Sequence, residues 1–218
     1  MIPEQRISNV IKNLKRRFPP EHFTEKHPDP FKILIATVLS QRTRDVKTDI
    51  AADRLFKVYT TAKKLAAADP KRVRKLIKPV GFYNQKTKRI IKISKILLQK
   101  YKGKVPADIE KMTSLPGVGR KTANCTMIYG FHKPAMCVDT NVHRVSNRIG
   151  LCRTKNPNKT ELALRQSVPQ KYWVDINELL VVHGQSICRP ITPLCSRCPI
   201  TRWCDYYRKE CKVKGKCR

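Results

Sequence analysis

The chain has 218 residues, of which 40% are hydrophobic and 29% are charged. This length and composition suit one compact domain or two small lobes, and they exclude a disordered chain. The longest apolar runs, such as 33–39, are too short to cross a bilayer, and the basic N-terminus lacks the continuous apolar segment of a secretory signal. We therefore expect no membrane partner and no secretory signal.

Positive charge extends along most of the chain. The 47 Lys and Arg residues outnumber the 16 Asp and Glu residues, which gives a formal net charge of +31. Such an excess predicts a polyanionic partner, most often nucleic acid. A ribosomal or histone-like protein, or one adapted to an unusual intracellular milieu, would carry a similar charge, so charge does not decide between these classes.

Helical periodicity dominates the sequence, and no segment shows a convincing strand alternation. Near the N-terminus the apolar residues at helical spacing are Ile7, Val10, Ile11 and Leu14. The next helix is predicted to begin at Pro30, with Asp29 as its N-cap. Further helices are predicted over 45–59, 61–69, 70–78, 86–101, 106–114, 120–131, 139–150, 158–168 and 171–184. The sequence therefore predicts an all-α protein.

Two of these helices carry specific expectations about their faces. In the segment 45–59 we expect the apolar residues to share one face, namely Val46, Ile50, Ala51 and Leu55. The segment 86–101 predicts a strongly amphipathic helix, with isoleucines and leucines inward. Its lysines are expected to face water or a phosphate backbone.

A glycine-rich turn lies between two predicted helices in the segment Leu115–Ala123, "LPGVGRKTA". Pro116, Gly117 and Gly119 favour a tight turn, because glycine reaches conformations closed to other residues. Such a turn brings bare backbone N–H groups to the positive end of the following helix, a combination that binds anions. On so basic a chain, the segment predicts contact with a DNA phosphate.

Lys121 lies in the first turn of the helix after this hairpin. A cation there opposes the helix dipole, which favours the neutral amine. With partial burial added, this position would suit a nucleophilic lysine. The alternative is one more phosphate-binding lysine.

Asp139 lies eighteen residues further on, in "CVDTNVHRV". It is predicted to be the N-cap of a helix that starts at Thr140, and this could be its whole role. A capping carboxylate accepts N–H bonds and stays ionised. It could then stabilise a sugar cation as a glycosidic bond breaks, a role that we favour over general-base catalysis.

The nine cysteines fall into two groups. Four of them lie close together near the C-terminus, namely Cys188, Cys195, Cys198 and Cys204. Four thiolates in a short loop suit a tetrahedral zinc ion or an iron–sulfur cubane, and the spacing does not separate the two. The scattered ones are expected to be small buried or peripheral thiols rather than a disulfide framework, namely Cys125, Cys137, Cys152, Cys211 and Cys217.

Several of these segments together resemble the endonuclease III family, bifunctional DNA glycosylases and AP lyases of the helix–hairpin–helix glycosylase superfamily. They are "LPGVGRKTAN", "VDTNVHRVSNRIGL" and the terminal cysteines. "LIATVLSQRTRDV" and "VGFYNQKTKRI" match in order and spacing as well, so the resemblance covers about 29–204.

The resemblance implies a two-lobed all-α fold with duplex DNA between the lobes. A six-helix barrel lobe would span 22–133 and contain the helix–hairpin–helix motif at about 108–131. An iron–sulfur cluster lobe would combine 1–21 with 134–218. Its cluster loop, 188–204, would hold a [4Fe-4S] cluster on the four grouped cysteines.

The resemblance also implies the reaction and the DNA contacts. Lys121 would attack C1′ of the damaged nucleotide, Asp139 would assist departure of the base, and β-elimination would cut the strand on the 3′ side. The expected substrates are oxidised pyrimidines and abasic sites. DNA contacts are implied for Gln41, Phe82, Leu115, Gly117, Val118, Gly119, Arg144, Arg189 and Arg197.

Two positions depart from the family pattern. Gln41 matches the glutamine that fills the hole left by an extruded base, but Phe82 stands where a leucine wedge is common. Asn141 stands where a histidine often follows the Asp-Thr pair, and asparagine does not titrate. We expect the bulk of Phe82 to alter the geometry of the wedge, and Asn141 to affect lesion preference or pH optimum.

Two other functions remain open. One is a monofunctional adenine or mismatch glycosylase of the same superfamily, which uses water and needs no amine at Lys121. The other is a non-enzymatic iron–sulfur protein that binds DNA, which would need neither Lys121 nor Asp139. In each case we expect a monomer in the cytoplasm, associated with the nucleoid.

Overall fold

The structure, a computed structural model, describes residues 3–19 and 29–212. Helices and turns make up this described part, which contains no strand, so the all-α prediction is confirmed. Within it, none of the helices combines the length and the apolar character needed to cross a membrane.

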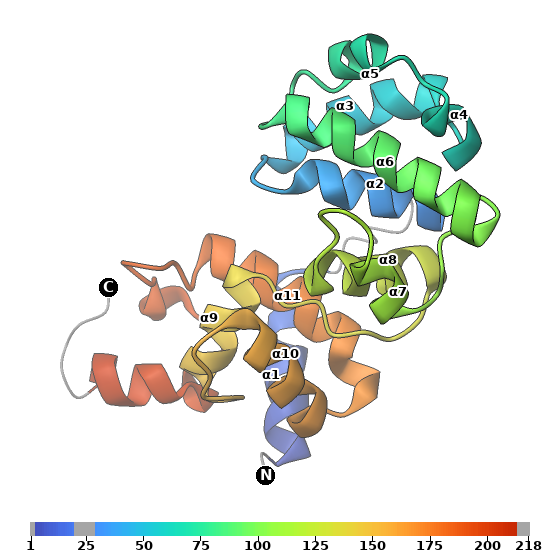
Figure 1. The fold of residues 1–218 in the computed structure, drawn as a ribbon. Coiled ribbons are helices and arrows are strands. Elements are labelled where there is room, and N and C mark those ends of the chain that lie inside the picture. Colours follow the sequence, from blue (N-terminus) through green and yellow to red (C-terminus); the bar gives the residue numbers. More distant parts are fainter. Residues whose placement is uncertain (1–2, 20–28, 213–218) are drawn as a thin grey trace. The chain divides into compact units, whose positions relative to one another are not determined.

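The chain divides into two compact units. Residues 23–133 form one, which we call the hairpin unit, and residues 1–22 with 134–218 form the other, which we call the cysteine unit. The hairpin unit contains α2 (Pro30–Ser40), α3 (Asp45–Val58), α4 (Ala62–Ala66), α5 (Pro70–Leu76), α6 (Tyr83–Tyr101), α7 (Ile109–Thr113) and α8 (Arg120–Phe131) (Figure 1). The cysteine unit contains α1 (Glu4–Arg17), α9 (Thr140–Ile149), α10 (Pro157–Ser167), α11 (Trp173–Ser186) and the short helical turns η2 (Gln170–Tyr172), η3 (Cys195–Arg197), η4 (Thr201–Trp203) and η5 (Tyr207–Lys212).

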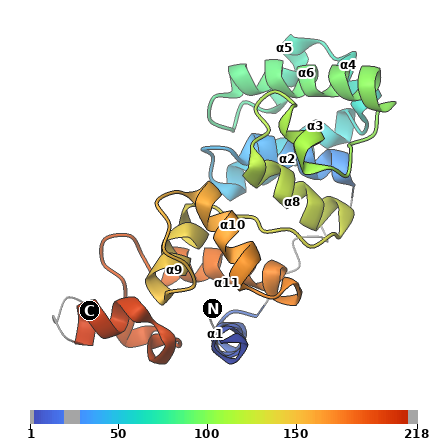
Figure 2. The same cartoon turned by 60° about the horizontal axis from the view of Figure 1, so that its bottom comes forward.

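Helix α2 lies at the centre of the hairpin unit and packs against α3, α6 and α8 (Figures 1 and 2). Its N-cap is Asp29, whose carboxylate accepts from the N–H of Phe31 at 2.9 Å, as predicted. Gly130 allows α8 to approach closely, because a Cβ there would lie 2.8 Å from the Cα of Pro30. The buried side chains of these helices form one apolar core.

The predicted face of α3 is wrong in part. Ala51 and Leu55 are buried, but Val46 and Ile50 are 72% and 42% exposed. Val46 and Leu55 are nine residues apart, which places them on opposite sides of a helix with 100° per residue. The buried face instead includes Thr48, Ala52 and Phe56, and α3 packs against α2 and α5.

In the cysteine unit, α1 and α9 pack against α11. The predicted apolar stripe of α1 is confirmed, since all four of its residues are buried in the core of this unit. Gly184 of α11 allows close packing against α9, because a Cβ there would lie 2.8 Å from the Cβ of Asn141.

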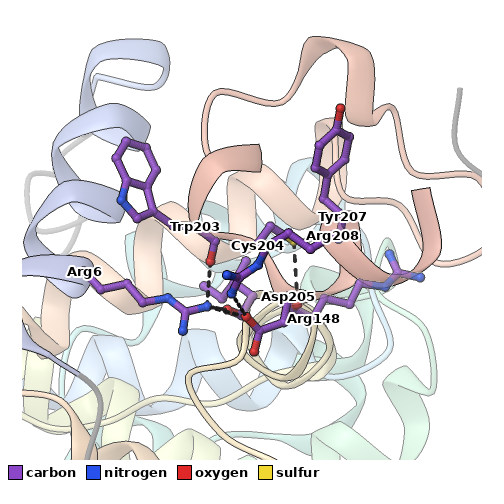
Figure 3. A network of polar contacts seen from close by, with 8 residues as sticks. Arg6, Arg148, Trp203, Cys204, Asp205, Tyr207 and Arg208 are labelled. Atoms are coloured by element: carbon purple, nitrogen blue, oxygen red, sulfur yellow. Dashed lines mark hydrogen bonds and ion pairs between the residues drawn. The ribbon is translucent and has the colours of Figure 1, made fainter. Parts of the chain in front are cut away.

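Arg6 of α1 binds the residues on both sides of the last grouped cysteine, Cys204 (Figure 3). Its guanidinium donates to the carbonyl oxygen of Trp203 at 2.7 Å and to Oδ1 of Asp205 at 2.8 Å. Gly150 has φ of +82°, and a Cβ at this position would collide with the Asp205 carboxylate. The network therefore ties the end of the cysteine loop to the N-terminal helix.

Candidate functional site

The glycine-rich hairpin joins α7 to α8. Leu115 and Val118 are buried in the core, and their N–H groups donate to the carbonyl oxygens of Met112 and Leu115. Gly117 has φ of +73°, and Gly119 is the N-cap of α8 without a side chain to cap it. Both glycines are exposed. The glycines are therefore accessible at the surface, while the two apolar residues shape the turn from inside.

Lys121 lies in the first turn of α8, as predicted. Its side chain is exposed, so the partial burial that we expected is wrong. The helix begins at Arg120, and the first turn of any helix leaves N–H groups without intrahelical partners. Position at a helix start, rather than burial, distinguishes this lysine.

Gln41 ends α2 and reaches the hairpin. Its Nε2 donates to the carbonyl oxygen of Gly117 at 2.9 Å and lies 3.4 Å from Oγ1 of Thr122. Its Oε1 accepts from Nη1 of Arg89 at 3.2 Å. The amide is thus held from both sides, beside the turn predicted to bind phosphate.

Phe82 is 56% exposed and has φ of +56°. A left-handed conformation is strained for an aromatic residue, and such strain concentrates at functional sites. Arg42, directly after Gln41, also has a positive φ of 52°, and its guanidinium lies 5.9 Å from the centre of the Phe82 ring. The two turns thus present their strained residues to each other.

Lys86 was not singled out from the sequence, where all lysines of α6 were expected to face outward. Its side chain is buried, and its Nζ donates to the carbonyl oxygens of Leu39 and Gln41 and to Oγ1 of Thr43. Burial, with a smaller contribution from Arg89, lowers the pKa of Lys86 from 10.5 to about 8. Lys86 thus hydrogen-bonds the free carbonyl oxygens at the carboxyl end of α2.

Asp139 is the N-cap of α9, as predicted. Its Oδ1 accepts from the N–H of Val142 at 2.7 Å, and its Oδ2 accepts from Nδ2 of Asn141 at 3.0 Å. Each carboxylate oxygen therefore has a donor that orients it. Asn141, the departure from the family pattern, thus holds the candidate catalytic carboxylate directly.

The side chain of Arg144 links Asn141 to the cysteine loop by hydrogen bonds. Its Nη2 donates to Oδ1 of Asn141 at 3.0 Å and to the carbonyl oxygen of Gly184 at 2.9 Å. Its Nε donates to the carbonyl oxygen of Cys188 at 3.1 Å, and burial lowers the pKa of the guanidinium. These hydrogen bonds run inside the unit, whereas we expected the side chain to contact DNA.

The four grouped cysteines line a single cavity of about 20 Å³. Burial raises the pKa of Cys198 to about 12 and that of Cys204 to about 11. Among residues 3–19 and 29–212, no group of three or more His, Cys, Asp or Glu side chains is arranged to hold a metal ion. The four cysteines thus lie around one space.

Hydrogen-bond donors surround these sulfurs. Nη1 of Arg148 lies 3.5 Å from the Sγ of Cys188, and the N–H of Tyr207 lies 3.5 Å from the Sγ of Cys204. Nε2 of His183 lies 3.8 Å from the Sγ of Cys198. Such donors suit sulfurs that carry negative charge.

Arg148 also shapes the loop between the first two grouped cysteines. It donates to the carbonyl oxygens of Arg189 and Pro190, each at 2.6 Å, and its guanidinium lies 4.7 Å from the centre of the Tyr206 ring. The side chains of Arg189 and Arg197 are exposed, so the two predicted phosphate-binding arginines are accessible.

The remaining cysteines differ from expectation. Three of them are disulfide-bonded, namely Cys125, Cys137 and Cys211. Cys152 is a half-buried free thiol, as expected, and Cys217 lies outside the described residues. The expectation of thiols is therefore wrong for three positions, because the fold, and not the local sequence, decides which sulfurs meet.

Residues 35–170 match the family described as HhH-GPD superfamily base excision DNA repair protein. Over 206 residues the chain is 48% identical to endonuclease III of Thermotoga maritima, a match that covers 94% of this chain and 95% of the relative. The chain belongs to the endonuclease III family. It is therefore a DNA glycosylase of base excision repair.

Solved structures of endonuclease III relatives have the same fold. The chain matches a trapped covalent intermediate of endonuclease III and DNA, an estranged-adenine complex, with a TM-score of 0.86 and 34% identity. This match covers 96% of the chain and 99% of the relative. A thermostable thymine-DNA glycosylase matches with a TM-score of 0.82 and 26% identity, over 93% and 95% of the two chains.

Proposed function

We propose that this endonuclease III relative is a bifunctional DNA glycosylase and AP lyase, with Lys121 as nucleophile and Asp139 as electrostatic partner. It removes damaged bases, oxidised pyrimidines foremost, from duplex DNA and cuts the strand on the 3′ side of the abasic site. The observation that carries this proposal is the position of the exposed residue Lys121, in the first turn of α8 and shortly after the exposed glycines of the hairpin.

The amine would form a covalent bond with the sugar. As the nitrogen of Lys121 attacks C1′, the glycosidic bond breaks and the base leaves with its electron pair. Loss of a proton and opening of the ring convert the adduct into a Schiff base. Removal of a C2′ proton then breaks the C3′–O bond, and water releases the lysine. The covalently trapped endonuclease III–DNA complex of a 34% identical relative supports such an intermediate.

Asp139 would stabilise the positive charge that develops on the sugar as the base departs. Its two oxygens already accept hydrogen bonds from Val142 and Asn141, which orient the carboxylate. This arrangement supports electrostatic stabilisation rather than proton abstraction. Because Asn141 does not titrate, it donates to Asp139 without a change in its own charge.

Base extrusion would use the two turns of the hairpin unit. Taking a nucleotide out of the stack costs a few kcal/mol, and least for damaged or mispaired bases. Gln41 would fill the vacated space, and the exposed ring of Phe82 would stack on the opposite base. The fixed amide of Gln41 supports this role, since it is oriented before DNA arrives.

The DNA backbone would be bound by exposed donors on both units. Gly117 and Gly119 present the hairpin backbone, and Arg189 and Arg197 present guanidiniums. We assign Arg144 to support of the cysteine loop instead, because its donors serve Asn141, Gly184 and Cys188. Chromosomal DNA as substrate implies a cytoplasmic protein associated with the nucleoid.

We also propose a [4Fe-4S] cluster on Cys188, Cys195, Cys198 and Cys204. In a cubane each thiolate binds its own iron atom, whereas a single zinc ion requires all four sulfurs at about 2.3 Å. All four cysteines line one cavity, and donors of Arg148 and Tyr207 lie 3.5 Å from the sulfurs of Cys188 and Cys204, which suits thiolates that carry negative charge. When bound, the cluster would cross-link the loop by metal–thiolate bonds.

The lysine distinguishes this proposal from a monofunctional glycosylase, which activates water instead. The likeness to a thymine-DNA glycosylase keeps mismatched thymine among the substrates to be tested. A non-enzymatic DNA-binding protein would need neither the oriented carboxylate of Asp139 nor an accessible amine after the hairpin. The arrangement of both therefore supports an enzyme that forms a Schiff base.

A panel of duplexes, each with one defined lesion, tests the proposal. We expect wild-type protein to release oxidised pyrimidines and to cut the strand, as seen on denaturing gels. Lys121→Gln should abolish cutting and borohydride cross-linking, and Asp139→Asn should slow excision by about 10²–10³-fold. Lys95→Gln, an exposed change on α6, should leave both activities unchanged. Persistent cross-linking by Lys121→Gln would exclude the lyase assignment.

A further inference from the structure

One buried ammonium connects the two turns that carry Gln41 and Phe82. The Nζ of Lys86 donates to the carbonyl oxygens of Leu39 at 2.7 Å and Gln41 at 2.6 Å. Its third bond goes to Oγ1 of Thr43 at 2.9 Å. A lysine ammonium has three N–H donors, so these three hydrogen bonds use all of them.

The hydroxyl of Thr43 joins the second turn to the first. It accepts from the N–H of Gly81 at 3.1 Å, and it lies 3.3 Å from the carbonyl oxygen of Gln41. Gly81 fits closely there, because a Cβ would lie 3.1 Å from the carbonyl oxygen of Arg42. The turn that precedes Phe82 therefore packs directly on the turn that follows α2.

The location of Lys86 is unusual for a charge. The side chain is only 2% exposed, on the same face of α6 as Ile90 and Ile93. Burial of a charged group costs free energy even when it is paired, so apolar residues usually occupy such positions. The negative end of the α2 dipole offsets part of this cost. The hydrogen bonds of Lys86 fix the turn after α2 relative to the turn at Gly81.

We propose that Lys86 is a positioning residue for base extrusion, which joins the end of α2 and the turn at Gly81 into one rigid body. Gln41 and Phe82 would then enter the duplex as a single unit, one at the vacated space and the other against the opposite base. This inference rests on the proposed function, and it assigns the buried lysine no contact with DNA.

The inference predicts a selective defect. A nucleotide in a stable pair must be extruded against stacking and pairing, whereas an unpaired nucleotide has lost most of that cost. If Lys86 serves extrusion, its loss slows excision from a paired site much more than from an unpaired site. If it serves the fold alone, both rates fall by the same factor.

Two variants break the connection in different ways. Lys86→Met removes the ammonium and keeps the length of the side chain, and Thr43→Val removes the shared hydroxyl and keeps the lysine. Lys88→Met is the matched control, because it removes the same charge from an exposed position of the same helix. Thermal unfolding of each variant establishes that it is folded before its activity is compared.

The experiment is single-turnover excision of one oxidised pyrimidine, placed in a full duplex and in a one-nucleotide bulge, with binding to undamaged duplex measured in parallel. We expect Lys86→Met and Thr43→Val to slow the paired substrate by about 10–100-fold and the bulged one by less than about threefold. Lys88→Met should keep the wild-type ratio of the two rates, and undamaged DNA should bind all three variants alike.

Equal slowing of both substrates by Lys86→Met and Thr43→Val, or wild-type rates on the paired one, would overturn the inference. If Lys86→Met does not fold, Thr43→Val decides alone. A wild-type protein that excises nothing contradicts the proposed function itself. A wild-type protein that excises the lesion, with variants that keep its ratio of rates, contradicts only the role of Lys86.

Discussion

Two surface regions are held in place by different interactions. One comprises the turns at Gln41 and Phe82, and the other is the cysteine loop, residues 188–204. In the hairpin unit the buried ammonium of Lys86 donates to two backbone carbonyl oxygens and to the hydroxyl of Thr43. In the cysteine unit the guanidiniums of Arg144 and Arg148 bind loop carbonyls, while four thiols line a cavity within the loop.

The difference reflects what lies underneath each region. The turns of the hairpin unit rest on the large apolar core formed by α2, α6 and α8, so one polar anchor fixes their geometry. The cysteine loop contributes few apolar side chains to its own core, chiefly Ile200. Such a loop needs covalent or metal–ligand bonds to compensate for the conformational entropy of ordering it.

Loss of one proposed cluster ligand should distinguish the two regions most strongly. We expect Cys198→Ser to destabilise the protein by more than about 4 kcal/mol, because a lost metal site ranks among the largest mutational effects. Hydrogen exchange should rise in the cysteine unit and stay near wild type in the hairpin unit. Cys152→Ser, a free thiol outside the loop, is the control. Equal exchange in both units would contradict the comparison.

Removal of a loop guanidinium should have an intermediate effect. Arg148→Met leaves the carbonyls of Arg189 and Pro190 and the Sγ of Cys188 without this donor. We expect a loss of about 1–3 kcal/mol and faster loss of iron on oxidation, followed by absorbance in the visible range. Arg153→Met removes the same charge from an exposed position. An iron-loss rate equal to that of this control would exclude a role for Arg148.

The backbone strain at Phe82 predicts a smaller effect in the hairpin unit. Phe82→Gly and Phe82→Ala both remove the ring, but only glycine adopts a φ of +56° without strain. We expect the glycine variant to be more stable than the alanine variant by about 1 kcal/mol in urea unfolding. At Val46, inside α3, the alanine variant should instead be more stable than the glycine variant. Greater stability of Phe82→Ala would contradict the strain argument.

A separate effect, confined to high pH, is the pH dependence that Lys86 contributes to stability. Its folded pKa of about 8 lies below the unfolded value of 10.5, so the unfolded chain binds more protons between these pH values. The free energy of unfolding should therefore rise with pH from about 8 to 10.5, relative to Lys86→Met. In Lys88→Met the free energy of unfolding should rise with pH as it does in the wild-type protein. An identical pH profile for wild type and Lys86→Met would contradict the burial of the ammonium.

Local patterns predicted the helix boundaries that depend on nearby residues. Asp29 and Asp139 cap their helices as expected, and the break at Pro70 separates α4 from α5. These features depend on a side chain and a backbone group within a few residues of each other. The short-range chemistry of capping and of proline therefore suffices to place them.

Contacts between distant segments were not predictable in the same way. Arg144 and Arg148 bind carbonyls about 40 residues further along the chain, which no local pattern indicates. Lys86 is different, because it lies four residues before Ile90 and seven before Ile93, and helical periodicity places it on their buried face. The assumption that lysines face water concealed it, although its position in the repeat was a usable signal.

Lys121 as nucleophile is the claim on which the proposed chemistry rests, and peptide mapping tests it most directly. Wild-type protein would be reduced with borohydride on a duplex with one oxidised pyrimidine, digested, and examined by mass spectrometry for the residue that carries the sugar. The chain contains 28 lysines, so many other amines could react by chance. We predict that the adduct maps to Lys121. An adduct on another lysine, or excision without any adduct, would contradict the mechanism.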